Sequence, residues 1–221
     1  MSALPTRREQ RKQDNRQKLI DATVALIAEG GLAAVTVSRV VARAGVSRGL
    51  VNLHFETKEA MLAEVMVALS EEWAVSWRRI LDDPRGGAAE RLQRLLETNF
   101  LPPVFADDKM ATWHCFYADP GYRRLYRERC HATDQAHLEA LAGLVETLDR
   151  EGGYGVGPGL LAARALRSVT GGLWLELLTE PEALGPEEAR TACRLVLQRF
   201  FPKHFQTAEE QRRLSLVPRR G

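Results

Sequence analysis

The segment over residues 36–62, TVSRVVARAGVSRGLVNLHFETKEAML, concentrates side chains that can contact a nucleic acid. Arg48, Asn52 and His54 can form hydrogen bonds with base edges or with phosphates. A hydroxyl at a helix N-terminus favours a phosphate oxygen, an ammonium group can neutralise a phosphate, and a glycine lets the backbone approach a duplex closely. The candidate DNA-contacting residues are Thr36, Ser47, Arg48, Gly49, Asn52, His54 and Lys58.

Two short helices joined by a tight turn would position these side chains. Thr36 can cap the first helix, Gly45 can make the turn, and Ser47 can cap a second helix that runs to about Phe55. This arrangement is a helix-turn-helix, whose second helix enters the major groove of DNA. The sequence therefore predicts a helix-turn-helix over residues 36–55, and a capped helical hairpin without a DNA-binding role is the alternative.

The remaining segments also have the periodicity of helices, and none has the two-residue alternation of a strand of useful length. Apolar residues between positions 19 and 28 predict a first helix that ends at Gly30. Thr57 can cap a long helix that reaches about Leu81. Five further helices are expected over residues 88–101, 107–117, 120–150, 158–179 and 186–201. The sequence thus predicts an all-α fold of about nine helices.

Positive charge is concentrated near the N-terminus. Residues 1–60 contain ten Lys and Arg and six Asp and Glu, a net charge of +4, whereas the whole chain carries +2. A basic segment favours a polyanionic partner, although basic solvated termini are common. A basic N-terminal arm that precedes the first helix can touch the phosphate backbone or the minor groove, or can act only as a solubilising tail. Its basic residues are Arg7, Arg8, Arg11 and Lys12.

The 36–62 segment resembles the signature of tetracycline-repressor-like (TetR family) transcriptional regulators. The matching residues are Thr36, Ala44, Gly45, Val46, Ser47, Gly49, Val51, His54, Phe55, Lys58 and Met61. At Asn52 the family usually has a tyrosine that touches the DNA backbone, whereas asparagine can read adenine. The resemblance implies a DNA-binding head over residues 1–57 and a ligand-binding and dimerisation domain over residues 58–205. The polar composition of residues 206–221 predicts a disordered tail.

Most of residues 88–180 resembles, more loosely, the choline-responsive repressors of glycine-betaine synthesis genes, through AAERLQRLLETNF, TWHCFYAD, YRRLYRERC and VTGGLWLELL. This resemblance implies a small-molecule effector such as a quaternary ammonium compound. Aromatic faces suit such a cation, with Asp119 or Glu176 as a counter-charge, but aromatic residues at helical spacing also form cores. The candidate ligand-binding residues are Trp113, Phe116, Tyr117, Trp174 and Glu176. A regulator of an efflux or catabolic operon with a hydrophobic effector is the alternative within the family.

Two adjacent pairs of histidine and cysteine suggest a metal site or a catalytic nucleophile, but their spacing does not allow both side chains of a pair to reach one metal ion. His114 and Cys115 are adjacent, as are Cys130 and His131, and neighbours on a helix point about 100° apart. No nucleophile, base and orienting group share a motif, and no phosphate-binding glycine loop follows a strand. We therefore expect a binding protein without metal or cofactor. An all-helical carrier or enzyme is the less favoured class.

The last two expected helices carry stripes of mainly apolar residues that can pair two chains. The stripes are Leu161, Ala165, Leu166, Val169, Leu173 and Leu177 on one helix, and Ala192, Leu195, Val196, Arg199 and Phe200 on the next. Gly171 and Gly172 would allow the helices to approach closely. Since major-groove half-sites recur about 34–36 Å apart, two heads on a palindromic operator require a two-fold dimer. Closure of each chain's own core is the alternative use of these stripes.

Cysteine content and hydropathy indicate a cytoplasmic protein. The three cysteines have no paired spacing, and no apolar leader opens the chain. No segment approaches the roughly 20 apolar residues that a membrane-spanning helix needs. The expected partners are therefore double-stranded operator DNA, a small-molecule effector and a second copy of the chain, without a membrane.

Overall fold

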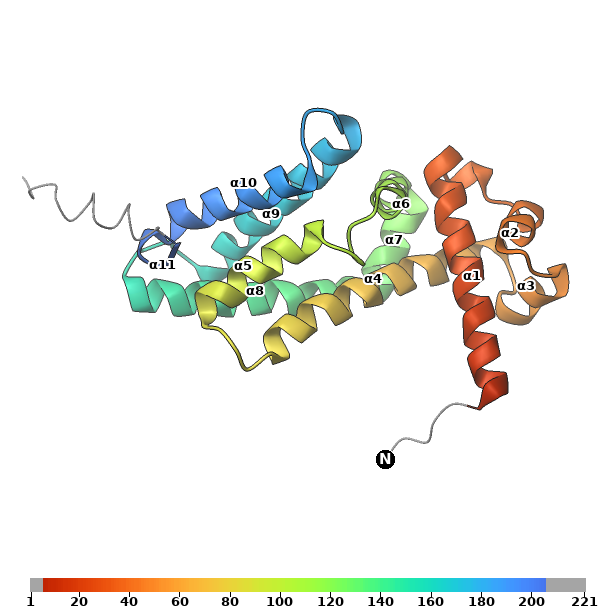
Figure 1. Ribbon diagram of the computed structural model, residues 1–221, viewed down its shortest axis with the longest axis horizontal. Helices are drawn as coiled ribbons and strands as arrows, with labels where there is room; N and C mark the ends of the chain where they lie inside the picture. The colour runs from red at the N-terminus through yellow and green to blue at the C-terminus, as the bar shows by residue number, and fades with distance from the viewer. Residues whose placement is uncertain (1–5, 206–221) are drawn as a thin grey trace, which may run out of the picture. The chain divides into compact units, whose positions relative to one another are not determined.

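The computed structural model describes residues 6–205, and every regular element in this range is a helix (Figure 1). The predicted all-α fold is confirmed, with eleven α-helices in the described range rather than about nine. They are α1 (Arg7–Gly30), α2 (Val37–Ala44), α3 (Arg48–His54), α4 (Lys58–Asp82), α5 (Ala88–Glu97), α6 (Asp107–Ala118), α7 (Pro120–Arg129), α8 (His131–Gly152), α9 (Gly159–Thr179), α10 (Pro186–Phe200) and α11 (Pro202–Phe205). Short 3-10 helices η1 (Leu32–Ala34) and η2 (Thr98–Phe100) follow α1 and α5. The tail expected over residues 206–221 lies outside the described residues.

The described chain forms two compact units. The head unit comprises residues 6–72 and 106–131, with α1–α3, most of α4, α6 and α7. The body unit comprises residues 73–105 and 132–205, with the end of α4, α5 and α8–α11. The compact units differ from the expected division because α6 and α7 pack with α1–α4. The functional boundary expected at residue 57 stays a prediction.

A single apolar core holds the head unit together. Leu19 and Ile27 of α1, Val40 of α2, Met61 of α4 and Phe116 of α6 are each at most 1% exposed and belong to this core. Their spacing follows the 3.6-residue period, so each helix turns one apolar stripe inward. The inserted α6 therefore helps to fix the position of the helix-turn-helix.

The basic residues near the N-terminus are helical, which corrects the expectation that they precede the first helix. The Thr6 hydroxyl accepts a hydrogen bond from the Glu9 backbone N–H at 3.3 Å, and the Glu9 carboxylate accepts from the Thr6 N–H at 2.7 Å. This reciprocal capping box starts α1 at Arg7. Arg7, Arg8, Arg11 and Lys12 therefore lie within the first two turns of α1. The expected end of α1 at Gly30 is confirmed.

The single helix expected over residues 120–150 is two helices, α7 and α8. Asp119 caps α7 by accepting from the Gly121 and Tyr122 N–H groups at 2.8 and 3.1 Å. The break lies at Cys130, whose backbone has φ −113° and ψ −15° and whose side chain is buried in the head core. Burial of this side chain accompanies the turn between the helices, and neither Gly nor Pro marks it in the sequence.

The helix expected over residues 88–101 also ends earlier, at Glu97. Asn99 donates from its side-chain amide to the carbonyl oxygens of Leu95 and Leu96, at 3.0 and 3.1 Å. These bonds satisfy two backbone acceptors at the helix end, and the chain tightens into η2.

The body unit has its own core and a buried ion-pair cluster. Leu92, Leu138 and Leu166 are fully buried and come from α5, α8 and α9. Glu97 at the end of α5 pairs with Arg190 and Arg194 of α10, at 3.1 and 3.0 Å. These charge-assisted bonds join α5 to α10. Over residues 6–205, no helix is both long and apolar enough to cross a membrane.

Candidate nucleic-acid interface and effector site

Helices α2 and α3 have the geometry of a helix-turn-helix. The Thr36 hydroxyl accepts from the Arg39 backbone N–H at 3.3 Å and caps α2. Gly45 ends α2 with φ 65° and ψ 33°, a left-handed conformation that glycine adopts without a steric penalty. Ser47 precedes α3 as expected, but its hydroxyl makes no capping bond there; its carbonyl oxygen instead accepts from the Leu50 N–H at 3.0 Å.

The start of α3 is presented to solvent. Ser47, Arg48 and Gly49 are exposed, whereas Val51 is 3% exposed and packs in the head core. Asn52 follows Val51 on the same helix. One face of α3 therefore holds the helix in place while its N-terminal residues remain accessible, as direct readout requires.

His54 lies at the end of α3 and is only partly accessible. Its Nε2 is buried and has no hydrogen-bond partner in the part of the chain that the structure describes. Burial lowers the pKa of His54, and the charges of Lys12 and Arg16 lower this pKa further. These charges place the basic part of α1 near the end of α3, within the head unit. The DNA contact expected for His54 stays a prediction.

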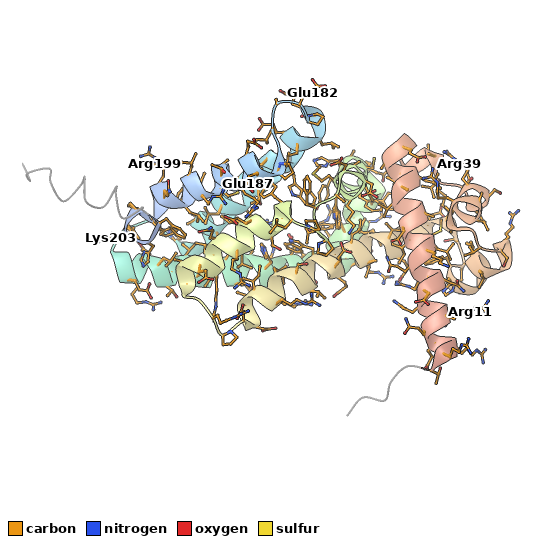
Figure 2. The ribbon with its side chains drawn as sticks, in the orientation of Figure 1. Arg11, Arg39, Glu182, Glu187, Arg199 and Lys203 are labelled. Atoms are coloured by element: carbon orange, nitrogen blue, oxygen red, sulfur yellow. The ribbon has the colours of Figure 1, made fainter. Side chains whose placement is uncertain are left out.

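Two exposed arginines of the head unit are suited to phosphate contacts: Arg11, which belongs to the expected basic arm, and Arg39, which the sequence did not single out. Arg11 on α1 and Arg39 on α2 are labelled in Figure 2. The first helix of a helix-turn-helix crosses the DNA backbone, so a guanidinium on α2 is suited to a phosphate. The sequence could have indicated Arg39 as a phosphate contact, because this residue lies three positions after the Thr36 cap, in the first turn of α2.

Three of the expected ligand-binding residues lie on α6 in the head unit. Phe116 is fully buried and packs in the head core. Trp113 and Tyr117 stack at 5.5 Å between ring centroids, and Tyr126 of α7 stands nearly perpendicular to both. These three rings contact one another at 5.5–5.9 Å and so form a packed cluster. The neighbouring Asp119 carboxylate caps α7.

The other two expected ligand-binding residues lie on α9 in the body unit. Trp174 is half-buried and donates from Nε1 to the Asn99 carbonyl oxygen at 2.8 Å. Glu176 is exposed. The five expected residues are thus divided between the two compact units, and their joint role in one site stays a prediction.

Comparison with known proteins identifies the family. Residues 19–65 match the family described as bacterial regulatory proteins, tetR family. Residues 88–202 match the BetI-type transcriptional repressor C-terminal domain. The chain belongs to the tetR family of bacterial regulatory proteins. The resemblance seen in the sequence is confirmed for both the head and the C-terminal part.

Similar proteins are also transcriptional regulators. The regulator BetI 2 of Chromohalobacter salexigens is 31% identical over 203 residues, which cover 84% of this chain and 88% of the relative. BetI of Escherichia coli K12 is 27% identical over 189 residues, covering 85% and 94%. These relatives support the expected class, a transcriptional regulator rather than an enzyme.

Solved structures of regulators share the fold. A putative transcriptional regulator from Pseudomonas aeruginosa PAO1 has a TM-score of 0.71 and 27% identity, and the match covers 91% of this chain and 96% of that one. A putative regulator from Saccharomonospora viridis in complex with choline has a TM-score of 0.68 and 20% identity, covering 84% and 96%. At 20% identity, the S. viridis structure shows only that the two chains share a fold.

The body unit of this TetR-family regulator contains an aromatic cluster that the sequence analysis missed. Trp73 and Trp77 of α4 surround His137 of α8, with ring centroids 4.5 and 5.4 Å from the imidazole. Trp73 also donates from Nε1 to the Asn99 side-chain oxygen at 3.1 Å. The spacing of four residues predicts that the two tryptophans share one face of a helix. Their contact with His137 could not be predicted, because it depends on how α4 and α8 pack in the fold.

The cysteines and histidines of the regulator show no grouping suited to metal binding. Cys130 and Cys193 are buried, and Cys115 is half-buried. Burial raises the pKa of the Cys193 thiol to about 11, so this sulfur stays protonated at neutral pH. Within residues 6–205, no three His, Cys, Asp or Glu side chains come close enough to hold a metal ion.

Proposed function

We propose that this regulator is a homodimeric repressor that binds a palindromic operator and is modulated by a small quaternary ammonium compound such as choline. The exposed N-terminal end of α3, anchored through buried Val51, carries the DNA-binding part of this proposal. Arg48 reads base edges, Thr36 and Ser47 position the head on phosphates, and Lys58 neutralises a phosphate. A regulator of transcription acts where the chromosome lies, so the proposal places the protein in the cytoplasm.

A binding titration tests the DNA-binding proposal. Fluorescence anisotropy compares labelled DNA from the region flanking the protein's own gene with random DNA of equal length. Arg48→Ala should weaken binding to the specific DNA about tenfold, because a bidentate base contact contributes about 1–3 kcal/mol. Arg150→Ala is a matched control, since Arg150 is an exposed arginine of the body unit. Equal affinity of the unaltered protein for both DNAs at every salt concentration would contradict this proposal.

Dimerisation is supported by apolar surface on α9 and α10. Leu161 and Leu175 of α9 are 62% and 49% exposed, and Leu195 of α10 is 56% exposed. Leu161 and Leu195 belong to the expected stripes, whereas Leu175 does not. Leu166 and Leu177 of the expected stripes are instead buried within the chain. The expected stripes therefore contribute both to the core of the single chain and to its exposed surface. The three exposed leucines form the proposed dimer seam.

The effector proposal rests on the BetI-type match over residues 88–202. The S. viridis structure was solved with choline, which is a quaternary ammonium alcohol. A ligand that binds one conformation of the regulator more tightly than the other shifts the population between them. Choline added to the protein–operator complex should therefore change operator affinity. An unchanged operator affinity would favour the alternative of a hydrophobic effector.

A further inference from the structure

The cluster of Trp73, Trp77 and His137 contains three buried polar atoms that have no hydrogen-bond partner among the described residues. These atoms are Nδ1 and Nε2 of His137 and Nε1 of Trp77. His137 is 2% exposed and Trp77 is 4% exposed, so bulk water does not reach either ring. Buried polar groups in native proteins are nearly always paired, because an unpaired group loses its bonds to water. A polar group seated in this cluster would satisfy these donor and acceptor atoms.

Three elements of the body unit hold this cluster in place. Asn99 of η2 accepts from Trp73 Nε1 through its side-chain oxygen and from Trp174 Nε1 through its backbone oxygen. The two amphipathic tryptophans are thereby fixed from α4 and from α9. Arg167 of α9 pairs with Asp134 of α8, one turn before His137, at 2.9 Å. The side chains of the cluster come from α4 and α8, and Asn99 of η2 and the Arg167–Asp134 ion pair connect them to α9.

The polar atoms of the cluster define the group that they can bind. Burial and, to a smaller extent, the charge of Arg167 lower the pKa of His137 to about 4, so the imidazole is neutral at pH 7. A neutral imidazole has one acceptor nitrogen and one N–H donor, and Trp77 adds an N–H donor. A hydroxyl group is complementary, because it can donate to the His137 acceptor and accept from the Trp77 N–H.

The rings around these atoms suit a compact organic cation. The guanidinium of Arg78 already lies 5.1 Å from the Trp77 ring centroid. The Trp73 ring packs against His137, with ring centroids 4.5 Å apart, so the half-buried indole of Trp174, fixed through Asn99, is the ring that we assign to a ligand cation. The neutral imidazole does not repel such a cation.

We propose that the Trp73–Trp77–His137 cluster binds the hydroxyl end of a small quaternary ammonium alcohol, with His137 accepting and Trp77 donating a hydrogen bond. This inference rests on the proposed effector class and deepens it. It assigns ligand selection to polar atoms that the sequence analysis did not consider. It also places the recognition site within the body unit.

Calorimetry with two probes tests the assignment on the full-length protein. Choline carries the hydroxyl group, and tetramethylammonium keeps the cation without it. The unaltered protein should bind choline at least tenfold more tightly than tetramethylammonium. In His137→Phe, choline affinity should fall to that of tetramethylammonium, whose affinity should change by less than about twofold. The thermal midpoint of unligated His137→Phe should be equal or higher, since the variant removes two unpaired polar atoms.

Matched variants separate this site from its alternatives. His131→Gln alters an exposed histidine of the same helix and should leave both affinities unchanged. Trp113→Phe tests the ligand site expected from the sequence, and loss of the choline preference in this variant but not in His137→Phe would overturn the assignment. Trp77→Phe removes the N–H donor while keeping an aromatic ring, and should reduce the choline preference as His137→Phe does. It provides the test if His137→Phe does not fold.

The outcomes distinguish this inference from the proposed function. If choline modulates operator binding but both variants keep the preference of the unaltered protein, the site assignment is wrong and the effector proposal stands. If neither probe binds the unaltered protein, the effector class and the site are both wrong, while operator binding is judged by the anisotropy experiment. If His137→Phe lowers the thermal midpoint and keeps the choline preference, the cluster has only a structural role.

Discussion

Lys58 donates a hydrogen bond from Nζ to the carbonyl oxygen of Leu32 at 3.1 Å, which ties the start of α4 to η1. The lysine expected to neutralise a phosphate is therefore half-buried and held in place. An ammonium group has three donors, so Lys58 can keep this bond while it contacts DNA. Such an anchored charge loses little side-chain entropy on binding.

Lys58→Ala should weaken binding to specific and random DNA alike. A phosphate contact carries no sequence information, so the slope of log affinity against log salt should become shallower by about one. Anisotropy titrations at several salt concentrations measure this slope. Lys203→Ala is the matched control, because Lys203 (Figure 2) also donates to a backbone carbonyl, that of Gly152, but belongs to the body unit. An unchanged slope for Lys58→Ala would leave the lysine a structural role only.

Asn52→Ala should relax discrimination at one base position of the operator. Asparagine can form a bidentate pair with adenine, and its loss should cost about 1–3 kcal/mol on the preferred base and little on other bases. Competition with operators substituted one base pair at a time measures this difference. An equal loss on specific and random DNA would instead indicate a phosphate contact.

Local sequence signals predicted much of the fold. The end of α1 at Gly30, the turn at Gly45 and the cap of α4 at Thr57 follow from backbone rules that act within a few residues. The break at Cys130 had no such signal. There, the buried thiol belongs to a core that assembles from distant helices, so local rules do not determine the boundary.

The candidate DNA-binding site was more predictable than the effector site. The helix-turn-helix lies within one continuous segment, so residue spacing alone brings Thr36, Gly45 and Arg48 together. The body cluster instead joins Trp73 of α4 to His137 of α8, which are far apart in the sequence. Helical periodicity predicts which face of a helix is apolar but not which helix covers it.

Arg11→Ala with Lys12→Ala should lower affinity for all DNA at low salt. Both residues are exposed in the second turn of α1, and Lys12 lies near enough to His54 to lower the pKa of that imidazole. Substitution is preferable to deletion, since removing residues 1–12 would also remove the Thr6–Glu9 capping box. Circular dichroism confirms that α1 remains folded. Unchanged affinity of the double variant would assign these residues a solubilising role.

Leu195→Asp should give monomers that keep their helical signal. Leu195 is 56% exposed in the single chain, so a carboxylate there costs the chain's own core little but would be buried unpaired in a dimer. Sedimentation at micromolar concentration should show a dimer for the unaltered protein and a monomer for the variant, with weaker operator binding. Glu139→Gln, at an exposed position of α8, is the control. A monomeric unaltered protein would remove the proposed seam.

His137 should make the body unit sensitive to acid. Its pKa is lowered from an ordinary value of 6.5 to about 4 in the folded protein, so between these values the unfolded chain binds more protons. The free energy of unfolding therefore falls as the pH drops from about 6.5 towards 4, by up to about 1.4 kcal/mol per pH unit from this group. His137→Phe should flatten this part of the stability curve, whereas His131→Gln should retain it. Urea unfolding at several pH values measures the slope, and equal slopes for His137→Phe and the unaltered protein would show that another group controls the acid response.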